Sequence, residues 1–168
     1  ICYLSPIVFM VYDAIAMAAQ PIQSYNYGKG DISRAWQALR YALRTGICYA
    51  LLIVVLAALL TKTVVGLFIE GSDPAYALAV EGLRFFSIAF VPMAVSIVIM
   101  GFFQSVERVS EAFVISVLRG FVLMLVCFVG MTLLWGLKGA WLAIPVSETL
   151  TMCVAVVLLA LYRKRIAR

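Results

Sequence analysis

Apolar residues run along this chain in long segments that short polar stretches separate. Between Arg84 and Glu107 there is no charged residue at all. A helix that crosses a lipid bilayer needs about 20 largely apolar residues, and this segment is long enough. Strict alternation of polar and apolar residues, which would favour strands, does not occur. The pattern predicts helical spans at residues of about 1–20, 45–69, 84–105, 112–135 and 139–162.

Capping signals mark two further helix starts. Either Asp73 or Ser72 is expected to cap the helix that comes after the span 45–69, and Pro74 suits its first turn. Asp31 is expected to cap a basic amphipathic helix over about 31–44. That basic helix either lies at the membrane interface, with its arginines toward lipid headgroups, or is a solvated connector beside a span.

Composition places the chain in lipid rather than in water. Hydrophobic residues make up 65% of the 168 residues and the mean hydropathy is +1.10, whereas an average soluble domain is about half apolar. Histidine is absent and the four cysteines stand singly, so we expect no metal site, no disulfide framework and no cofactor. Neither catalytic residues nor binding of nucleic acid is expected.

The basic residues predict which ends of the spans face the cytoplasm. Cytoplasmic loops of membrane proteins carry an excess of lysine and arginine. With five spans, one set of loops holds only Lys62, Arg84 and Lys138. The other set is therefore expected to be cytoplasmic, with the C-terminus inside, in a multi-pass protein of the cell membrane. That set consists of Lys29, Arg34, Arg40, Arg44, Arg108, Arg163, Lys164, Arg165 and Arg168.

The first residues of the chain, ICYLSP, include no methionine and no basic segment before the apolar run. A secretory signal peptide needs a charged start and a cleavage site of small residues. We therefore expect the chain to begin within a helix and to be part of a longer protein.

Three ionisable residues fall inside predicted spans: Asp13, Arg119 and Glu148. A charge at mid-membrane costs at least about 2.5 kcal/mol, so such residues are candidates for transport or ion coupling. Asp13 and Arg119 are expected at similar depths, roughly 10 Å from the cytoplasmic ends of their helices. Either the two residues form a salt bridge, or Arg119 extends to the phosphates at the cytoplasmic surface.

Glu148 follows Pro145 by three residues. A proline inside a helix removes one hydrogen bond and leaves a carbonyl group free. Glu148 is therefore expected to take one of two roles. It forms a cation or proton site with freed carbonyls, as in transporter helices broken at mid-membrane, or it bonds to neighbouring side chains at a packing kink.

Aromatic and methionine side chains are frequent in the span 84–105. Methionine repacks easily, so these side chains suit a cavity for varied lipophilic cations. The alternative is that most of them face lipid or other helices, as they do in ordinary spans. The residues are Phe85, Phe86, Phe90, Met93, Met100, Phe102 and Phe103.

The polar block QPIQSYNYGKGD, from Gln20 to Asp31, closes the first span. It resembles the motif that ends the second helix of each half of multidrug and toxic compound extrusion (MATE) transporters. Its longer form is most similar to the second half of such proteins. Later segments resemble the same family in the same order, namely GLFIEGSDPAYALAVEGLRFF, GFFQSVERVSEAFVISVLRG and GLKGAWLAIPVSETLT. In the last segment the matching residues are Gly136, Gly139, Trp141, Ala143, Pro145 and Glu148.

This resemblance implies an all-α membrane protein with two six-helix lobes around a central cavity. Residues 1–168 would form a partial C-terminal lobe, a polytopic helical bundle of about five spans with the first span truncated. Such proteins are antiporters that export organic cations and drugs against inward Na⁺ or H⁺. The implied partners are the missing N-terminal lobe of the same chain, membrane lipids and small lipophilic cationic substrates.

The coupling residues of the family do not carry over to this chain. In one branch they lie on the seventh and tenth helices, and in another branch on the first helix. The first and seventh helices are outside the expected spans, and the span 84–105, which corresponds to the tenth, has no acidic residue. Asp13, Glu148 and Arg119 are therefore candidates only because of their position within the membrane.

Within the polar block, Gln20, Pro21, Asn26 and Gly28 are expected to form a structural corner or a cytoplasmic gate. Asn26 and Gly28 suit unusual backbone angles. Two other functions stay open, a lipid-linked oligosaccharide flippase of the same superfamily and a non-transporting structural subunit. A flippase should have a strongly basic cavity, whereas Arg119 is the one basic residue expected deep in the membrane. The acidic residues inside the spans disfavour a structural subunit.

Overall fold

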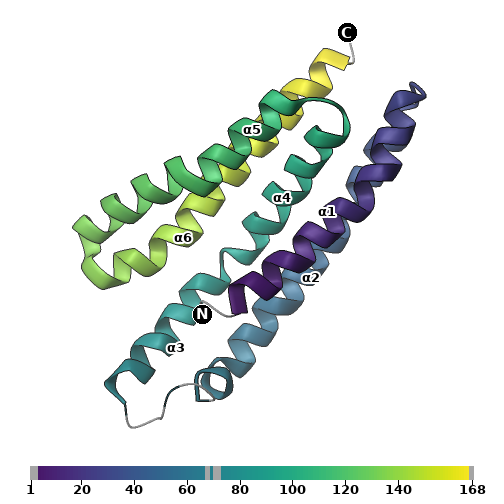
Figure 1. Cartoon of the computed structure of the whole chain (residues 1–168). Coiled ribbons are helices and arrows are strands. Elements are labelled where there is room, and N and C mark those ends of the chain that lie inside the picture. The colour runs from purple at the N-terminus through teal and green to yellow at the C-terminus, as the bar shows by residue number, and fades with distance from the viewer. Residues whose placement is uncertain (1–3, 67–68, 70–72, 167–168) are drawn as a thin grey trace.

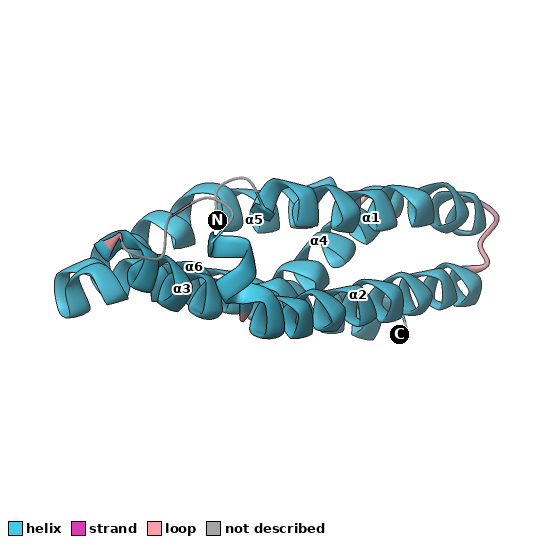
Figure 2. Ribbon diagram, turned by 90° about the horizontal axis from the view of Figure 1, so that it is seen from below, coloured by secondary structure: helices cyan, strands magenta, loops and turns pink. Residues whose placement is uncertain are grey.

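The computed structural model describes residues 4–66, 69 and 73–166. These residues form helices joined by short loops and contain no strand, which confirms the all-α class (Figures 1 and 2). In chain order the helices are α1 (Leu4–Gly28), α2 (Ile32–Gly66), α3 (Pro74–Ser87), α4 (Phe90–Ser105), α5 (Val109–Val117), the π-helix η1 (Leu118–Val122) and α6 (Leu123–Ile166).

α4 lies at the centre of the bundle because it is apolar on every side. It packs against α1, α2 and α6 (Figure 1), and Ile97 and Phe102 are each only 1% exposed. A helix that is hydrophobic all round must be buried in protein or lipid. The outer helices instead turn large apolar side chains outward, such as Leu59 and Leu133. This outward apolar surface suits a lipid environment.

A cluster of aromatic side chains packs the core at the end of the bundle where α6 ends. Trp36 of α2 lies 5.2 Å from Phe102 between ring centroids, and Tyr162 of α6 lies 5.9 Å from Phe103. Such aromatic pairs add about 0.5–1.5 kcal/mol each to the free energy gained by burial. Phe102 and Phe103 therefore pack between helices, which is the second of the two alternatives considered for these side chains.

Two of the described helical segments, Ile32–Gly66 and Val109–Ile166, are long and apolar enough to cross a membrane. α3 and α4 make a third such segment if they are taken together, although they bend by 42° at the break between them. The span expected at 84–105 is thus α4 plus the end of α3. Asp73 caps α3 as expected, because its side chain accepts a hydrogen bond from the N–H of Ala75 at 2.8 Å.

The chain reverses direction inside α6, at Gly136, where φ is +59° and ψ is −136°. The second part of α6 then returns along η1 and α5 (Figure 1). A Cβ atom at Gly139 would collide with the carbonyl oxygen of Met131, and one at Gly82 would lie 2.6 Å from the ring of Trp141. In the segment GLKGAW, Gly136 therefore makes the tight turn, Gly139 lies against the backbone of Met131, and Trp141 packs against Gly82.

The basic helix expected at 31–44 is not a separate element, since α2 runs without a break from Ile32 to Gly66. Its 35 residues measure about 50 Å at 1.5 Å per residue, well beyond a hydrocarbon core of roughly 30 Å. The first turns therefore extend out of the lipid. Asp31 caps the helix as expected and accepts from the N–H of Arg34 at 3.1 Å. This hydrogen bond, helped by the hydroxyl of Ser33 and the charge of Arg34, lowers the pKa of Asp31.

The polar block does not turn the chain where we expected. α1 continues for seven residues beyond Pro21 and ends at Gly28. The left-handed residue is Gly30, with φ of +78°, so the unusual angles expected at Asn26 and Gly28 are wrong. The N–H of Asp31 donates to the carbonyl of Asn26 at 2.9 Å, as is usual where a helix ends in a Schellman turn. The corner thus needs one glycine just beyond the last helical turn.

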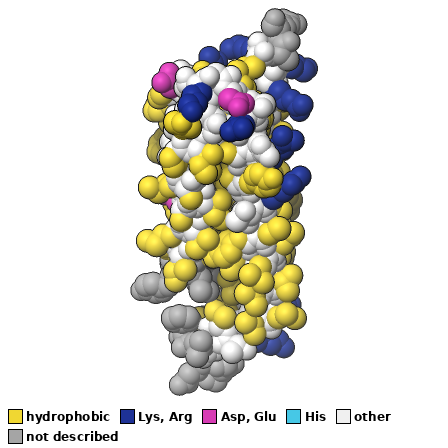
Figure 3. All heavy atoms as spheres, turned by 90° about the vertical axis from the view of Figure 1, so that its right-hand side faces the viewer, with side chains coloured by type: hydrophobic (Ala, Val, Ile, Leu, Met, Phe, Trp, Pro, Cys, Tyr) yellow, Lys and Arg dark blue, Asp and Glu magenta, His cyan; other side chains and the backbone are white. Residues whose placement is uncertain are grey.

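Basic side chains gather at one end of the bundle. The end of α1, the start of α2, the α4–α5 connection and the end of α6 all lie there (Figure 1). In Figure 3 most of the basic side chains in view cover this end, and hydrophobic side chains cover the middle of the same face. The basic residues expected on one side of the membrane are therefore at the same end of the bundle, apart from Arg168, which lies outside the described residues.

Candidate functional site

A cleft of about 620 Å³ opens between α1, α4, η1 and α6. Its wall is mostly apolar and includes three methionines and two phenylalanines. Arg119 and Glu148 are the charged side chains in this wall. The lining residues are Pro6, Phe9, Phe86, Met93, Met100, Ser116, Arg119, Gly120, Met124, Ile144 and Glu148.

Only part of the expected methionine and aromatic surface lines this cleft. Phe86, Met93 and Met100 do so, from α3 and α4. Phe90 instead lines a separate apolar cavity of about 200 Å³, beside Tyr49 of α2. Three of the seven expected side chains therefore form a soft wall around the buried charges.

Arg119 and Glu148 form an ion pair across the cleft wall. The Nε of Arg119 lies 3.0 Å from Oε1 and 3.2 Å from Oε2 of Glu148. The side chains are only 12% and 10% exposed. Breaking such a buried pair on one side is costly, because the charge that remains has no partner in a medium of low dielectric constant. Each residue therefore lowers the free-energy cost of burying the charge of the other.

This pair takes the place of the salt bridge between Asp13 and Arg119 that we considered. The side chain of Arg119 is 12% exposed and bonds to Glu148, although similar depths were expected for Asp13 and Arg119. α1 packs mainly on α2 and α4, whereas η1 packs on α6. Depth alone was therefore not sufficient to predict the partner of Arg119, because the carboxylate that it meets, Glu148, lies on α6, the helix beside η1. In the described part of the chain, Asp13 is half-buried on α1 and takes part in no ion pair.

The backbone around Arg119 is itself unusual. Arg119 lies in the π-helical turn Leu118–Val122, and such turns within α-helices are frequent at functional sites. Its guanidinium also lies 4.9 Å from the ring centroid of Phe9 on α1, within range of a cation–π interaction. The contact with Phe9 was not predicted, because a phenylalanine in an apolar helix does not indicate which side chain it will contact.

Pro145 does not break α6, which stays helical on both sides of it. Thr149 Oγ1 donates to the carbonyl of Pro145 at 2.7 Å, and Ser147 Oγ donates to the carbonyl of Ile144 at 2.9 Å. Among the described residues no three metal-ligating side chains come together. Glu148 bonds to a neighbouring side chain, that of Arg119, and its role as a cation or proton site stays a prediction.

Gln20 and Pro21 of the polar block lie at a junction between α1 and α4. Gln20 Nε2 donates to Gln104 Oε1 at 3.0 Å, and Ser105 Oγ donates to Gln23 Oε1 at 2.9 Å. Gln20, Pro21 and Gln104 help to line a polar cavity of about 450 Å³ at this junction. The partners Gln23 and Gln104 were missed, although a glutamine within an apolar run is a usable signal.

Comparison with known proteins shows what this arrangement resembles. The outward-facing conformation of a multidrug resistance MATE family transporter of the MOP superfamily superposes with a TM-score of 0.80 at 19% identity, over 90% of this chain and 34% of that chain. The inward-facing conformation of such a transporter gives a TM-score of 0.80 at 19% identity, over 95% and 38%. A MATE in complex with MaL6 gives 0.80 at 20% identity, over 95% and 37%.

These likenesses show the fold, and they cover about a third of each transporter. No curated protein matches this chain. The family model named MatE matches residues 3–129, which is well over half of the 168 residues. The matched region runs from α1 into α6 and includes the polar block and Arg119. The chain therefore belongs to the MatE family.

Proposed function

We propose that this chain is part of a cation-coupled antiporter that exports organic cations, drugs or toxic metabolites by alternating access. The observation that carries the proposal is the cleft, in which an ion pair is enclosed by methionine and aromatic side chains in a MatE family chain. Aromatic faces attract organic cations, and thioethers adapt to varied shapes. A lipophilic cation matches such a wall better than a neutral polar solute does.

In this proposal, Glu148 supplies the negative charge that an exported cation or a coupling Na⁺ or H⁺ needs. Arg119 is its resident counter-ion, so the empty cleft carries no net charge from this pair. Asp13 is the second candidate carboxylate, because it lies within α1 and outside the ion pairs of the described residues. Charged residues inside a membrane commonly serve ion or proton pathways.

The proposed transporter needs a second lobe, because alternating access requires two halves that move around a shared site. The similar superposition on an outward-facing and an inward-facing transporter supports a lobe that keeps its fold while the halves reorient. The basic end of the bundle supports an orientation with the C-terminus in the cytoplasm of a multi-pass protein of the cell membrane.

A lipid-linked oligosaccharide flippase is disfavoured, because the arginine in the cleft is already neutralised by Glu148. A phosphate-bearing substrate would need an excess of positive charge there. A non-transporting subunit would show no efflux in the experiment that follows.

The proposal is tested with the natural full-length protein in a cell strain that lacks its own drug pumps. The Na⁺ and H⁺ gradients are collapsed separately, and we expect ethidium efflux to stop when the gradient of the coupling ion is lost. We also expect efflux to fall strongly in Glu148→Gln. Glu81→Gln is the matched control, because Glu81 is 40% exposed and pairs with Lys138 away from the cleft. The absence of gradient-dependent efflux of any cation would contradict the exporter. Normal efflux by Glu148→Gln would remove Glu148 from the mechanism.

A further inference from the structure

Glu107, in the loop between α4 and α5, has an unfavourable backbone conformation. Among the described residues it is the one other than glycine with a positive φ angle, +59°. Residues with a Cβ atom adopt this left-handed region at a cost in free energy, whereas glycine enters it freely. Gly30, just after α1, takes a similar angle of +78°. A glycine at position 107 would therefore avoid a cost that the glutamate carries.

The two corners are the same hydrogen-bonded turn. After α4 the N–H of Arg108 donates to the carbonyl of Phe103 at 2.9 Å, and after α1 the N–H of Asp31 donates to the carbonyl of Asn26 at 2.9 Å. Both contacts have the spacing of a Schellman turn, in which the left-handed residue is usually glycine. The backbone of this corner therefore does not require Glu107, and a role for its side chain would explain why a glutamate is there.

That side chain lines the polar cavity of about 450 Å³ between α1 and α4. Gln20 also lines this cavity, and its Nε2 donates to Gln104, which leaves its Oε1 to accept another hydrogen bond. Ser24 Oγ donates to the carbonyl of Pro21 at 3.3 Å and keeps its own lone pairs as acceptors. A carboxylate, an amide oxygen and a hydroxyl oxygen therefore line one cavity, and such a set suits a cation that carries N–H donors.

Glu107 is also the free negative charge of the basic end, as far as the described residues show. Asp31 pairs with Arg34, and Glu111 pairs with Arg108. Glu107 is exposed and takes part in none of the ion pairs of the described residues. A small cation that approaches this end therefore finds an unneutralised carboxylate at the polar cavity.

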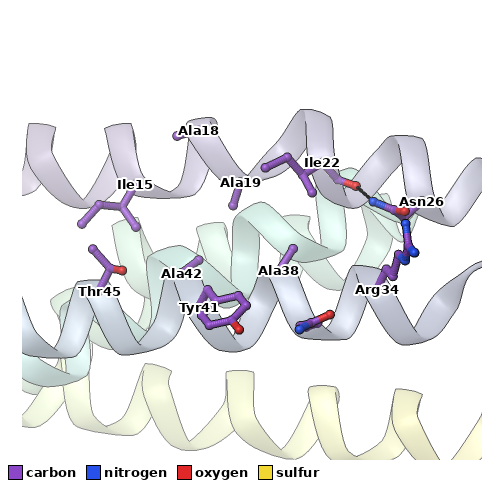
Figure 4. Close-up of a pocket in the computed structure, with 11 residues that line it drawn as sticks. Ile15, Ala18, Ala19, Ile22, Asn26, Arg34, Ala38, Tyr41, Ala42 and Thr45 are labelled. Atoms are coloured by element: carbon purple, nitrogen blue, oxygen red, sulfur yellow. Dashed lines mark hydrogen bonds between the residues drawn. The ribbon is translucent and has the colours of Figure 1, made fainter.

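The opposite side of α1 offers a cation no such group. A cleft of about 710 Å³ lies there between α1 and α2, with Arg34 and Asn26 in its wall (Figure 4). The side-chain amide of Asn26 donates to the carbonyl of Ile22 at 2.7 Å, and the charge of Arg34 is paired with Asp31. No carboxylate lines this cleft. Of the two openings beside the polar block, the one toward α4 is therefore the one suited to a cation.

The polar cavity is also close to the cleft that holds the buried ion pair. Met100 lines that cleft, and Gln104 lines the polar cavity. These two residues of α4 are four positions apart, so they lie on the same face of the helix, about 6 Å apart along its axis. α4 runs toward the basic end, and the polar cavity is therefore one helical turn nearer to that end than the cleft is.

We propose that Glu107, Gln20 and Ser24 form an encounter site for protonated amines at the end of the lobe proposed above to face the cytoplasm. The carboxylate attracts the cation, and the oxygens of Gln20 and Ser24 accept hydrogen bonds from its N–H groups. The next turn of α4 then leads to the cleft. This inference rests on the proposed function, because it describes where an exported cation first binds.

Stopped-flow fluorescence with the purified natural full-length protein tests the encounter site. The probe is dansylcadaverine, a fluorescent primary amine. Glu107→Gln should lower its association rate constant by up to about fivefold, as expected for one exposed charge pair. The difference should vanish at roughly 1 M salt, where charges are screened beyond about 3 Å. Glu107→Asp, which keeps the charge, should stay close to the wild type, and Glu81→Gln is the control at the other end of the bundle.

A matched pair of probes tests the hydrogen bonds of the site. Ser24→Ala should slow the association of dansylcadaverine about twofold, the effect of one modest hydrogen bond. The same variant should leave its N-trimethylated analogue unaffected, because that cation has no N–H group at its charged end. Equal slowing of both probes would overturn the assignment to protonated amines.

Glu107→Gly separates the encounter site from a role in folding. Glycine should keep or raise the melting temperature of the protein, because it relieves the backbone, and should slow association as much as Glu107→Gln does. Association that is independent of Glu107 at low salt, or no association with the wild type, would overturn the encounter site even if ethidium efflux is normal. Association that depends on Glu107 without any efflux would instead remove the exporter and leave a cation-binding site.

Discussion

At the residue scale, the lobe holds two charges inside lipid by placing them against each other. Arg119 and Glu148 are almost buried, and Phe9 covers the guanidinium. A buried pair is not required for stability as such, because apolar side chains of similar volume often do as well. The penalty arises when one charge is left alone. Variants that remove one partner or both therefore measure what the pair contributes to stability.

Removal of one partner should destabilise the protein more than removal of both. We expect Arg119→Met and Glu148→Leu each to lower the free energy of unfolding by about 3–5 kcal/mol, and the double variant to recover most of it. Thermal unfolding of the full-length protein in detergent measures this. The control is the exposed pair of Lys138 and Glu81, whose disruption should cost at most about 1 kcal/mol. A double variant as unstable as either single variant would contradict the expected coupling.

At the scale of elements, α5, η1 and α6 form a helical hairpin that depends on small residues at its turn. Gly136 supplies a positive φ angle, and Gly139 lies directly against the backbone of Met131. Trp141 then packs where Gly82 of α3 has no side chain. The turn therefore sets how the two arms of the hairpin pack, and with it the distance between Arg119 and Glu148.

Gly139→Ala should weaken this hairpin by roughly 1–3 kcal/mol or more, because overpacking against backbone cannot relax easily. Gly130→Ala is a matched control on the same helix, since nothing lies within 4 Å of a Cβ atom there. The control should be neutral or should stabilise slightly, because alanine is the better helix former. Thermal unfolding of both variants measures the difference. Equal stability of the two would show that the contact with Met131 is loose.

At the scale of the whole molecule, α4 joins the parts of the bundle. α4 packs on α1, α2 and α6, and the Gln20–Gln104 hydrogen bond ties α1 to α4 at the basic end. The fold is equally similar to an outward-facing and an inward-facing transporter. We therefore expect the Gln20–Gln104 junction to be a structural corner rather than a gate.

A disulfide between Gln20→Cys and Gln104→Cys distinguishes the two roles. In a full-length protein without its native cysteines, oxidation should close the disulfide and leave ethidium efflux within about twofold of the reduced protein. The reason is that both residues belong to one moving body. Efflux that stops on oxidation and returns on reduction would make the junction a gate. Either single-cysteine variant controls for effects of the oxidant.

Local signals in the sequence were sufficient for several features of the fold. The caps at Asp31 and Asp73 could be predicted because an N-cap depends on a few neighbouring residues. The continuity of α2 through residues 44 and 45 could not, since nothing local distinguishes one long helix from two short ones. Glycine in the polar block predicted a turn, but not that Gly30 rather than Gly28 would take the left-handed angle.

The sequence by itself determined the all-helical class, the clustering of basic residues and the likeness to the MatE family. Lipid demands long apolar helices with internally bonded backbone, and a motif is a local string of residues. Only the tertiary structure decided that Arg119 meets Glu148, and that Phe102 and Phe103 face the core while Met93 and Met100 face a cleft. The physical reason is that hydrophobic pattern and depth place a residue along its own helix, whereas its neighbours depend on how that helix is turned and which helices pack beside it.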